Sequence, residues 1–115
     1  MIRIAIPIFH QRVSPVLDTC TRLLIIDYEG QAEVDRREVA FDGYTLAERF
    51  EIVKKLNPDA IICCGISEAF DRMFQATGIR LICGIVGDVQ QVAEAFLCNR
   101  LDAPCFWMPG FKSDG

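Results

Sequence analysis

The sequence predicts an α/β domain with a ribonuclease H-like, mixed five-stranded sheet and three helices. Two observations lead to this prediction: the order of the strand-like and helix-like segments, and a change of period near residue 45. Before that point apolar residues form short strand-like runs, whereas after it they recur at helical spacing between short apolar segments. Strands joined by short turns form an antiparallel meander, and strands separated by single helices run parallel through right-handed crossovers.

Three strand-like segments occupy the first 41 residues: IRIAIPIF (2–9), RLLIIDYE (22–29) and AEVDRREVAF (32–41). A long loop from His10 to Thr21 joins the first two. The residues Glu29-Gly30-Gln31 are typical of a hairpin turn between the second and third. We therefore expect these three strands to form the antiparallel meander.

The remaining segments alternate helices with short apolar strands, and each helix begins at a side chain able to cap it. They are a helix from Thr45 to Asn57, the strand 59–64, a helix from Ser67 to Gly78, the strand 79–86 and a helix from Asp88. A flavodoxin-like sheet is the alternative, and it would need a helix in place of the second or third strand.

Length and composition predict one domain over residues 1–101, followed by a C-terminal tail, 102–115. The apolar stretch 105–108 in the tail should fold back on the core; the alternative is an exposed patch for a partner or a homodimer contact. The net charge of −4, without a basic cluster, disfavours nucleic acid. No apolar run is long enough for a membrane span, and the first residues lack a signal-peptide pattern, so we expect a cytoplasmic protein without membrane contact.

Enzyme signatures are absent from the sequence. It contains no G-x-S-x-G, no P-loop and no H-E-x-x-H motif. The first strand carries no acid, although ribonuclease H-type cleavage needs carboxylates that hold metal ions. We therefore expect a binding protein rather than an enzyme.

A binding site is expected where the carboxyl ends of the parallel strands meet. The loop 10–21, the segment CCGIS (63–67) and the segment CGIVGD (83–88) should come together there. Glycines in the last two segments permit close approaches. The helix that begins at Ser67 should offer its free N–H groups and positive dipole end to an anion.

The chain has six cysteines but no C-x-x-C, which disfavours zinc-ribbon and thioredoxin-like readings. Side chains alternate along a strand, so Cys63 and Cys64 should point to opposite faces. One should pack in the core, and Cys64, nearer the end of the strand, is the candidate to reach the site; the burial typical of free cysteines favours the alternative of two packed thiols. Cys64, Cys83 and the only histidine, His10, are the candidate metal ligands.

The segments RVSPVLD (12–18), CGIS (64–67) and GIVGDV (84–89), in this order, resemble those of the dinitrogenase iron–molybdenum cofactor-binding family. The resemblance covers residues 2–101 and is to the small stand-alone members. It implies the ribonuclease H-like fold and the binding of an anionic iron–sulfur or iron–molybdenum-type cluster for delivery in cofactor assembly. The implied binding residues are Ser14, Cys63, Gly65, Ile66, Ser67 and Gly87.

Two positions depart from that family's pattern. Nitrogenase-associated members often carry His-Phe-Gly where this chain has Val16, Leu17 and Asp18, and stand-alone members often have glycine at the position of Cys64. The expected function is therefore metallocluster carriage with an assembly protein as partner. A metal-free module for a small anion or a protein partner is the alternative, and a thiol-redox enzyme using Cys63, Cys64 or Cys83 is the third hypothesis.

Overall fold

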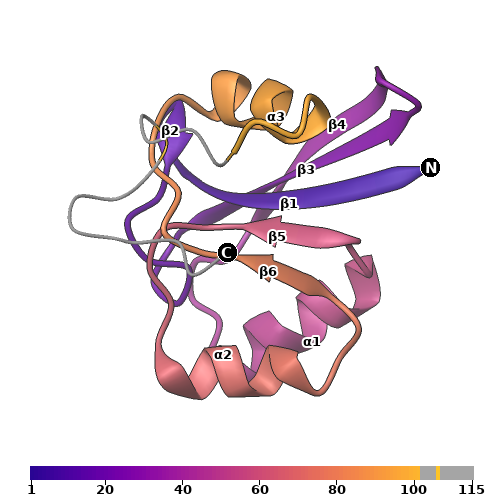
Figure 1. Ribbon diagram of the computed structural model, residues 1–115. Coiled ribbons are helices and arrows are strands. Elements are labelled where there is room, and N and C mark those ends of the chain that lie inside the picture. Colours follow the sequence, from indigo (N-terminus) through magenta and orange to yellow (C-terminus); the bar gives the residue numbers. More distant parts are fainter. Residues whose placement is uncertain (102–105, 107–115) are drawn as a thin grey trace.

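The computed structural model describes residues 1–101 and 106, which form a mixed sheet with three helices (Figure 1). The strands are β1 (Ile2–Phe9), β2 (Arg12–Val13), β3 (Arg22–Glu29), β4 (Ala32–Ala40), β5 (Ala60–Ile62) and β6 (Arg80–Ile82). The helices are α1 (Leu46–Leu56), α2 (Glu68–Gln75) and α3 (Val89–Leu97). The sheet order is β4-β3-β1-β5-β6, with β2 paired to β1 beside this path.

The directions of the strands match the expected meander and crossovers. β3 is antiparallel to both β1 and β4, whereas β5 and β6 run parallel to β1 and to each other. The second and third long strands are strands and not helices, so the flavodoxin-like alternative is wrong. The predicted count of five strands is also wrong, because two residues of the first loop pair with the end of β1 as a sixth strand, β2.

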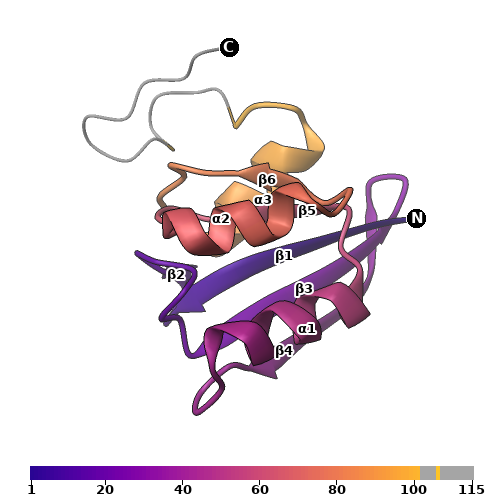
Figure 2. The same ribbon diagram turned by 90° about the horizontal axis from the view of Figure 1, so that it is seen from below.

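Helices cover both faces of the sheet: α3 lies on one face, and α1 and α2 lie on the other (Figures 1 and 2). The alternation of side chains along each strand produces this arrangement. On β1, Ile4, Ile6 and Ile8 belong to the core layer with α3. Ala5, between them, belongs to the layer with α1 and α2. Each of the inner strands is therefore buried on both sides.

The predicted helix caps are present at all three helices. Thr45 and Glu48 form a reciprocal capping box at α1. Ser67 caps α2, and Asp88 caps α3 by accepting a hydrogen bond from the Gln91 N–H at 3.1 Å. Local side-chain chemistry therefore determines where each helix begins.

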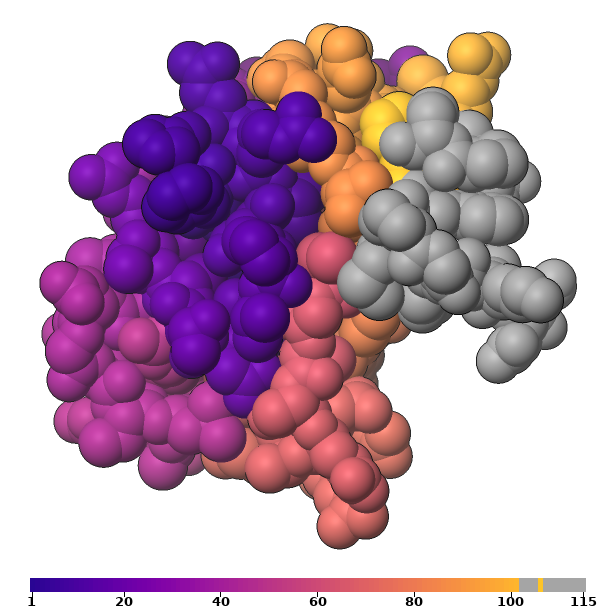
Figure 3. Space-filling view, turned by 90° about the vertical axis from the view of Figure 1, so that its left-hand side faces the viewer, coloured from indigo at the N-terminus to yellow at the C-terminus, as the bar shows by residue number. Residues whose placement is uncertain are grey.

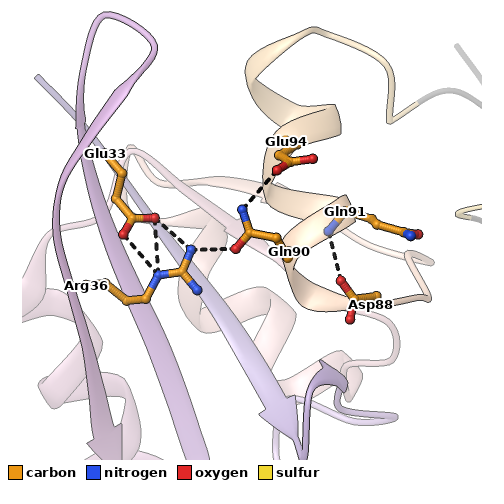
Figure 4. A network of polar contacts seen from close by, with 6 residues as sticks. All are labelled: Glu33, Arg36, Asp88, Gln90, Gln91 and Glu94. Atoms are coloured by element: carbon orange, nitrogen blue, oxygen red, sulfur yellow. Dashed lines mark hydrogen bonds and ion pairs between the residues drawn. The ribbon is translucent and has the colours of Figure 1, made fainter.

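Two polar clusters join elements of the fold, one between the sheet and a helix and one between two strands. In the first, Arg36 on β4 binds Glu33 at 2.7 Å and the amide oxygen of Gln90 on α3 at 2.8 Å (Figure 4). In the second, Arg3 on β1 donates two hydrogen bonds to Asp27 on β3, at 2.6 and 3.0 Å. This guanidinium lowers the pKa of Asp27, chiefly through the hydrogen bonds.

No helix in the described part of the chain is long and apolar enough to cross a membrane. Of the predicted tail, 102–105 and 107–115 lie outside the described residues. Phe106 is described: it packs against the core layer of α3, and its carbonyl oxygen accepts a hydrogen bond from the Val86 N–H at 2.6 Å. The division into residues 1–101 and 102–115 stays a prediction.

Candidate functional site

Three loops meet at the carboxyl ends of β1, β5 and β6, and backbone hydrogen bonds join them. The Leu17 N–H donates to the Gly65 carbonyl at 2.8 Å, which links the first loop to the second. The Val13 N–H donates to the Gly87 carbonyl at 3.0 Å, which links the first loop to the third. Figure 3 shows this edge of the molecule, with the first loop beside the two strand-to-helix loops. The predicted meeting point of the three segments is therefore a closely hydrogen-bonded edge.

Gly65 is required by the contact between the first two loops. Its N–H donates to the Pro15 carbonyl at 2.9 Å, and a Cβ at Gly65 would lie only 2.8 Å from that oxygen. Gly87 is required for a different reason, because its φ of +127° is a conformation that other residues rarely adopt. Both glycines hold the loops together, which is a structural role within the candidate site.

The N-terminus of α2 does not offer a free anion site as predicted. The Asp18 carboxylate accepts a hydrogen bond from the Ser67 N–H at 2.8 Å and a second from the Ser67 hydroxyl. The Ser67 hydroxyl oxygen in turn accepts from the Phe70 N–H at 3.1 Å. Glu68 and Asp71 lie in the first turn of the same helix. A carboxylate of the chain itself therefore occupies this helix end, in acidic surroundings.

The N-terminus of α3 is also satisfied from within the chain. Asp88 caps it, and the Val89 N–H donates to the Gln11 carbonyl at 2.8 Å. The sequence predicted that Asp88 would cap this helix. At each of these helix ends an aspartate of the chain therefore already accepts a backbone N–H, from Ser67 at α2 and from Gln91 at α3.

The adjacent cysteines point to opposite faces of the sheet, as alternation requires. Cys63 is fully buried in the layer of α1 and α2, and Cys64 is 8% exposed in the layer of α3. Cys64 therefore does not reach solvent, and the alternative of two packed thiols is the one that the structure has. Its side chain is covered because Ile85 and Val89 belong to the same apolar layer.

Cys83 is the partly exposed thiol of this edge, and its partner is Cys63. The two sulfur atoms lie 3.9 Å apart, with the Cys63 thiol donating to the Cys83 sulfur. This hydrogen bond lowers the pKa of Cys83 and raises that of Cys63, whose burial raises it further. Burial also raises the pKa of Cys64. Of these three thiols, Cys83 therefore becomes a thiolate most readily.

His10 lies in the turn between β1 and β2, where its backbone adopts a left-handed φ of +57°. Its ring is exposed and contacts Phe9 edge-on, with centroids 4.4 Å apart. It borders a hollow of about 400 Å³ that Arg36 and Val89 also line. Within residues 1–101 and 106, no three His, Cys, Asp or Glu side chains are grouped to hold a metal ion. The predicted set of Cys64, Cys83 and His10 is thus not assembled.

The other implied binding residues have structural positions at the same edge. Ser14 is buried, and its N–H donates to the Pro7 carbonyl at 2.8 Å. Ile66 is partly buried and packs on the layer of α1 and α2. The side chains of Ser14 and Ile66 are therefore at least partly buried within these loops.

Sequence reasoning missed two features of this edge, the clamp of Asp18 on Ser67 and the pairing of Cys63 with Cys83. The first had no local signal, because the two residues are 49 positions apart. The pairing of the two thiols had a local signal, because Cys63 and Cys83 both lie in short apolar strands, 59–64 and 79–86, that the sequence predicts to run parallel. Aligning those strands in register would have placed the two thiols side by side.

The opposite edge of the sheet carries a larger hollow, of about 620 Å³. Phe50, Lys54, Asp59, Met73 and Thr77 are among the residues that line it. It contains none of the predicted site residues.

No protein-family model matches the chain, and no curated protein sequence does either. Solved structures do match. The crystal structure of PH0822 superposes with a TM-score of 0.82 at 21% identity, over 90% of this chain and 95% of that one. A crystal structure described as a candidate dinitrogenase of Methanocaldococcus jannaschii gives 0.72 at 23% identity, over 85% and 89%. An NMR structure described as a candidate NifB protein from Thermotoga, of the DUF35 family, gives 0.69 at 19% identity over the whole of both chains.

At these identities the likeness defines the fold. The chain is therefore a small α/β protein with the same arrangement of sheet and helices as these three structures. What their names say about activity belongs to those proteins.

Proposed function

We propose that this protein binds and carries an anionic iron–sulfur or iron–molybdenum-type cluster as an accessory of cofactor assembly, without catalysing a reaction. The observation that carries the proposal is Cys83, a partly exposed thiol at the edge where the three loops meet. Thiolates are the usual protein ligands of iron–sulfur clusters. The fold is shared with proteins named as a candidate dinitrogenase and a candidate NifB protein, which supports the nitrogenase-related direction.

The ribonuclease H-like arrangement belongs to the same proposal. Without the two-residue β2, the long strands lie in the order third, second, first, fourth, fifth, with only the second antiparallel to the central first strand. This order supports the fold implied by the resemblance to the cofactor-binding family.

Attachment through a metal–thiolate bond fits this edge better than attachment through a helix dipole. Asp18 already fills the α2 end, and Glu68 and Asp71 add negative charge beside it. A like charge would be repelled there, whereas a bond from iron to the Cys83 sulfur does not depend on free helix N–H groups. The remaining ligands would come from the cluster's own sulfides, from small thiols or from a partner protein.

Anaerobic reconstitution with iron and sulfide, with molybdate in a second arm, tests the proposal. The wild-type chain should take up iron and sulfide and develop visible thiolate-to-iron absorption. Cys83→Ser should abolish this uptake. Cys64→Ser is the matched control, because that thiol is buried on the other face and its loss should leave uptake unchanged. Equal uptake by Cys83→Ser and the wild type would refute cluster attachment at this thiol.

A protein partner is the second candidate ligand of the same edge, and the specific observation is exposed apolar surface. Phe9, the last residue of β1, is 60% exposed, and Val16, within the first loop, is 37% exposed. A contact between proteins at this edge would bury these two apolar side chains. Phe9→Ser should weaken co-elution with a cofactor-assembly enzyme in size-exclusion chromatography, and unchanged co-elution would exclude this surface.

A further inference from the structure

Cys63 and Cys83 come directly after the two adjacent parallel strands β5 and β6. Ile62 pairs with Ile82 in the register of β5 and β6, and the two cysteines follow directly. The Cys63 N–H donates to the Ile82 carbonyl at 2.9 Å, so the sheet pairing continues to this position. Their relative position is therefore set by the backbone.

This geometry lies within reach of a disulfide. Neighbouring strands are about 4.7–4.9 Å apart, and a disulfide bridges Cα atoms about 4.4–6.8 Å apart. The sulfur atoms are 3.9 Å apart and already in contact. Closing to the roughly 2.05 Å of a disulfide bond requires side-chain rotation without separating the strands.

The two thiols differ in access to solvent. Cys63 is fully buried beneath α1 and α2, whereas Cys83 is partly exposed. A small oxidant arriving from solvent has access to the partly exposed Cys83 but not to the buried Cys63, whose sulfur lies 3.9 Å from that of Cys83. One reactive and one resolving thiol is the arrangement found in redox-sensitive cysteine pairs.

We propose that Cys83 is a site of oxidation by hydroperoxides and that Cys63 resolves the product into a reversible disulfide between β5 and β6. The Cys83 sulfur attacks one peroxide oxygen, an S–O bond forms, the O–O bond breaks, and the departing hydroxide takes a proton to become water. The Cys63 sulfur then attacks the Cys83 sulfenic acid, forming the S–S bond. Its own proton leaves with the hydroxyl group as a second water.

The overall reaction converts two thiols and one hydrogen peroxide into one disulfide and two waters. The two sulfurs together lose two electrons, and the peroxide gains them. A dithiol reductant reverses the change by thiol–disulfide exchange.

The test uses the full metal-free chain, reduced anaerobically, freed of reductant and then exposed to hydrogen peroxide. Residual thiols are alkylated under acidic denaturing conditions, and peptides are mapped by mass spectrometry. The expected product is a linked pair of peptides containing Cys63 and Cys83, lost on treatment with dithiothreitol. Cys98 is exposed and serves as an internal reference for oxidation of an ordinary surface thiol.

Variants separate the two roles. In Cys63→Ala, the Cys83 sulfenic acid should persist and be trapped by dimedone, whereas Cys64→Ala should form the same disulfide as the wild type. If a variant fails to fold, the peptide map of the oxidised wild-type protein still shows whether the disulfide between Cys63 and Cys83 forms. Cys83 remaining reduced while Cys98 is oxidised would overturn the proposal, and so would a disulfide from Cys83 to any residue other than Cys63.

A consequence for cluster carriage rests on the proposed function. A disulfide would remove Cys83 as a ligand, so the oxidised chain should take up no iron until it is reduced. The disulfide is mapped in metal-free protein. Failure to find the disulfide would therefore contradict the redox proposal alone, and failure to take up a cluster would contradict the proposed function alone.

Discussion

Replacing Gly65 with alanine tests the contact on which the candidate site is built. The added Cβ would lie 2.8 Å from the Pro15 carbonyl oxygen, and real Cβ atoms essentially never have contacts shorter than 3.0 Å. The obstacle is backbone, so the first loop must move away. That movement strains or breaks two hydrogen bonds, from the Gly65 N–H to Pro15 and from the Leu17 N–H to Gly65.

The expected cost follows from these contacts. Forcing an extra carbon into a packed contact typically costs about 1–3 kcal/mol, and each backbone hydrogen bond contributes a net of about 0.5–1.5 kcal/mol. We expect Gly65→Ala to lower the free energy of unfolding by about 1–3 kcal/mol, measured by urea denaturation. The melting temperature should fall by at least about 4 °C, measured by circular dichroism.

Gly78→Ala is the matched control. No atom lies within 4 Å of a Cβ at Gly78, and its φ lies outside the left-handed range. This change should be neutral or slightly stabilising, because alanine reduces the conformational freedom of the unfolded chain. If Gly65→Ala is as stable as Gly78→Ala, the account of the loop contact is refuted.

Three further changes test other parts of the structure. Asp18→Ala removes both carboxylate contacts to Ser67 and should cost about 1–2 kcal/mol of unfolding free energy in urea; no change would mean that the clamp is not formed. Arg3 lowers the pKa of Asp27 in the folded state. The ion pair therefore stabilises the fold fully above the unfolded-state pKa of an aspartate, about 4. This stabilisation is lost as the pH falls through the lower folded-state pKa. Asp27→Asn should therefore show a smaller loss of stability than the wild type between about pH 7 and pH 3, and equal acid sensitivity would contradict this. Phe70→Ala empties a fully buried position and should cost about 3–5 kcal/mol, or unfold the domain; a cost below 1 kcal/mol would mean that the ring is not packed as described.

The elements of the fold could be predicted because their signals are local. The capping pair Thr45 and Glu48 lies within one helical turn, and the turn at Gly30 lies between two strand-like runs. The sixth strand was missed because Arg12–Val13 has no pattern of its own. It becomes a strand only because the chain turns back at His10 onto the end of β1.

The meeting of the three loops was predicted correctly, whereas the exposure of Cys64 was not. The sequence placed the three loops at one edge and assigned Cys63 and Cys64 to opposite faces, which the structure also has. It assigned exposure to Cys64 because that residue is nearer the end of its strand. The exposed fraction of a side chain depends on what packs over it, and α3 arrives from a distant part of the sequence.

The sequence by itself determined the order of the other five strands and the three helices, the helix caps, the hairpin turn at Gly30 and the opposite faces of Cys63 and Cys64. These follow from periodicity and from contacts within a few residues. Only the tertiary structure decided that Asp18 fills the α2 end and that Cys63 faces Cys83. Both contacts join residues at least 20 positions apart, and they exist because folding brings separate strands and loops into register.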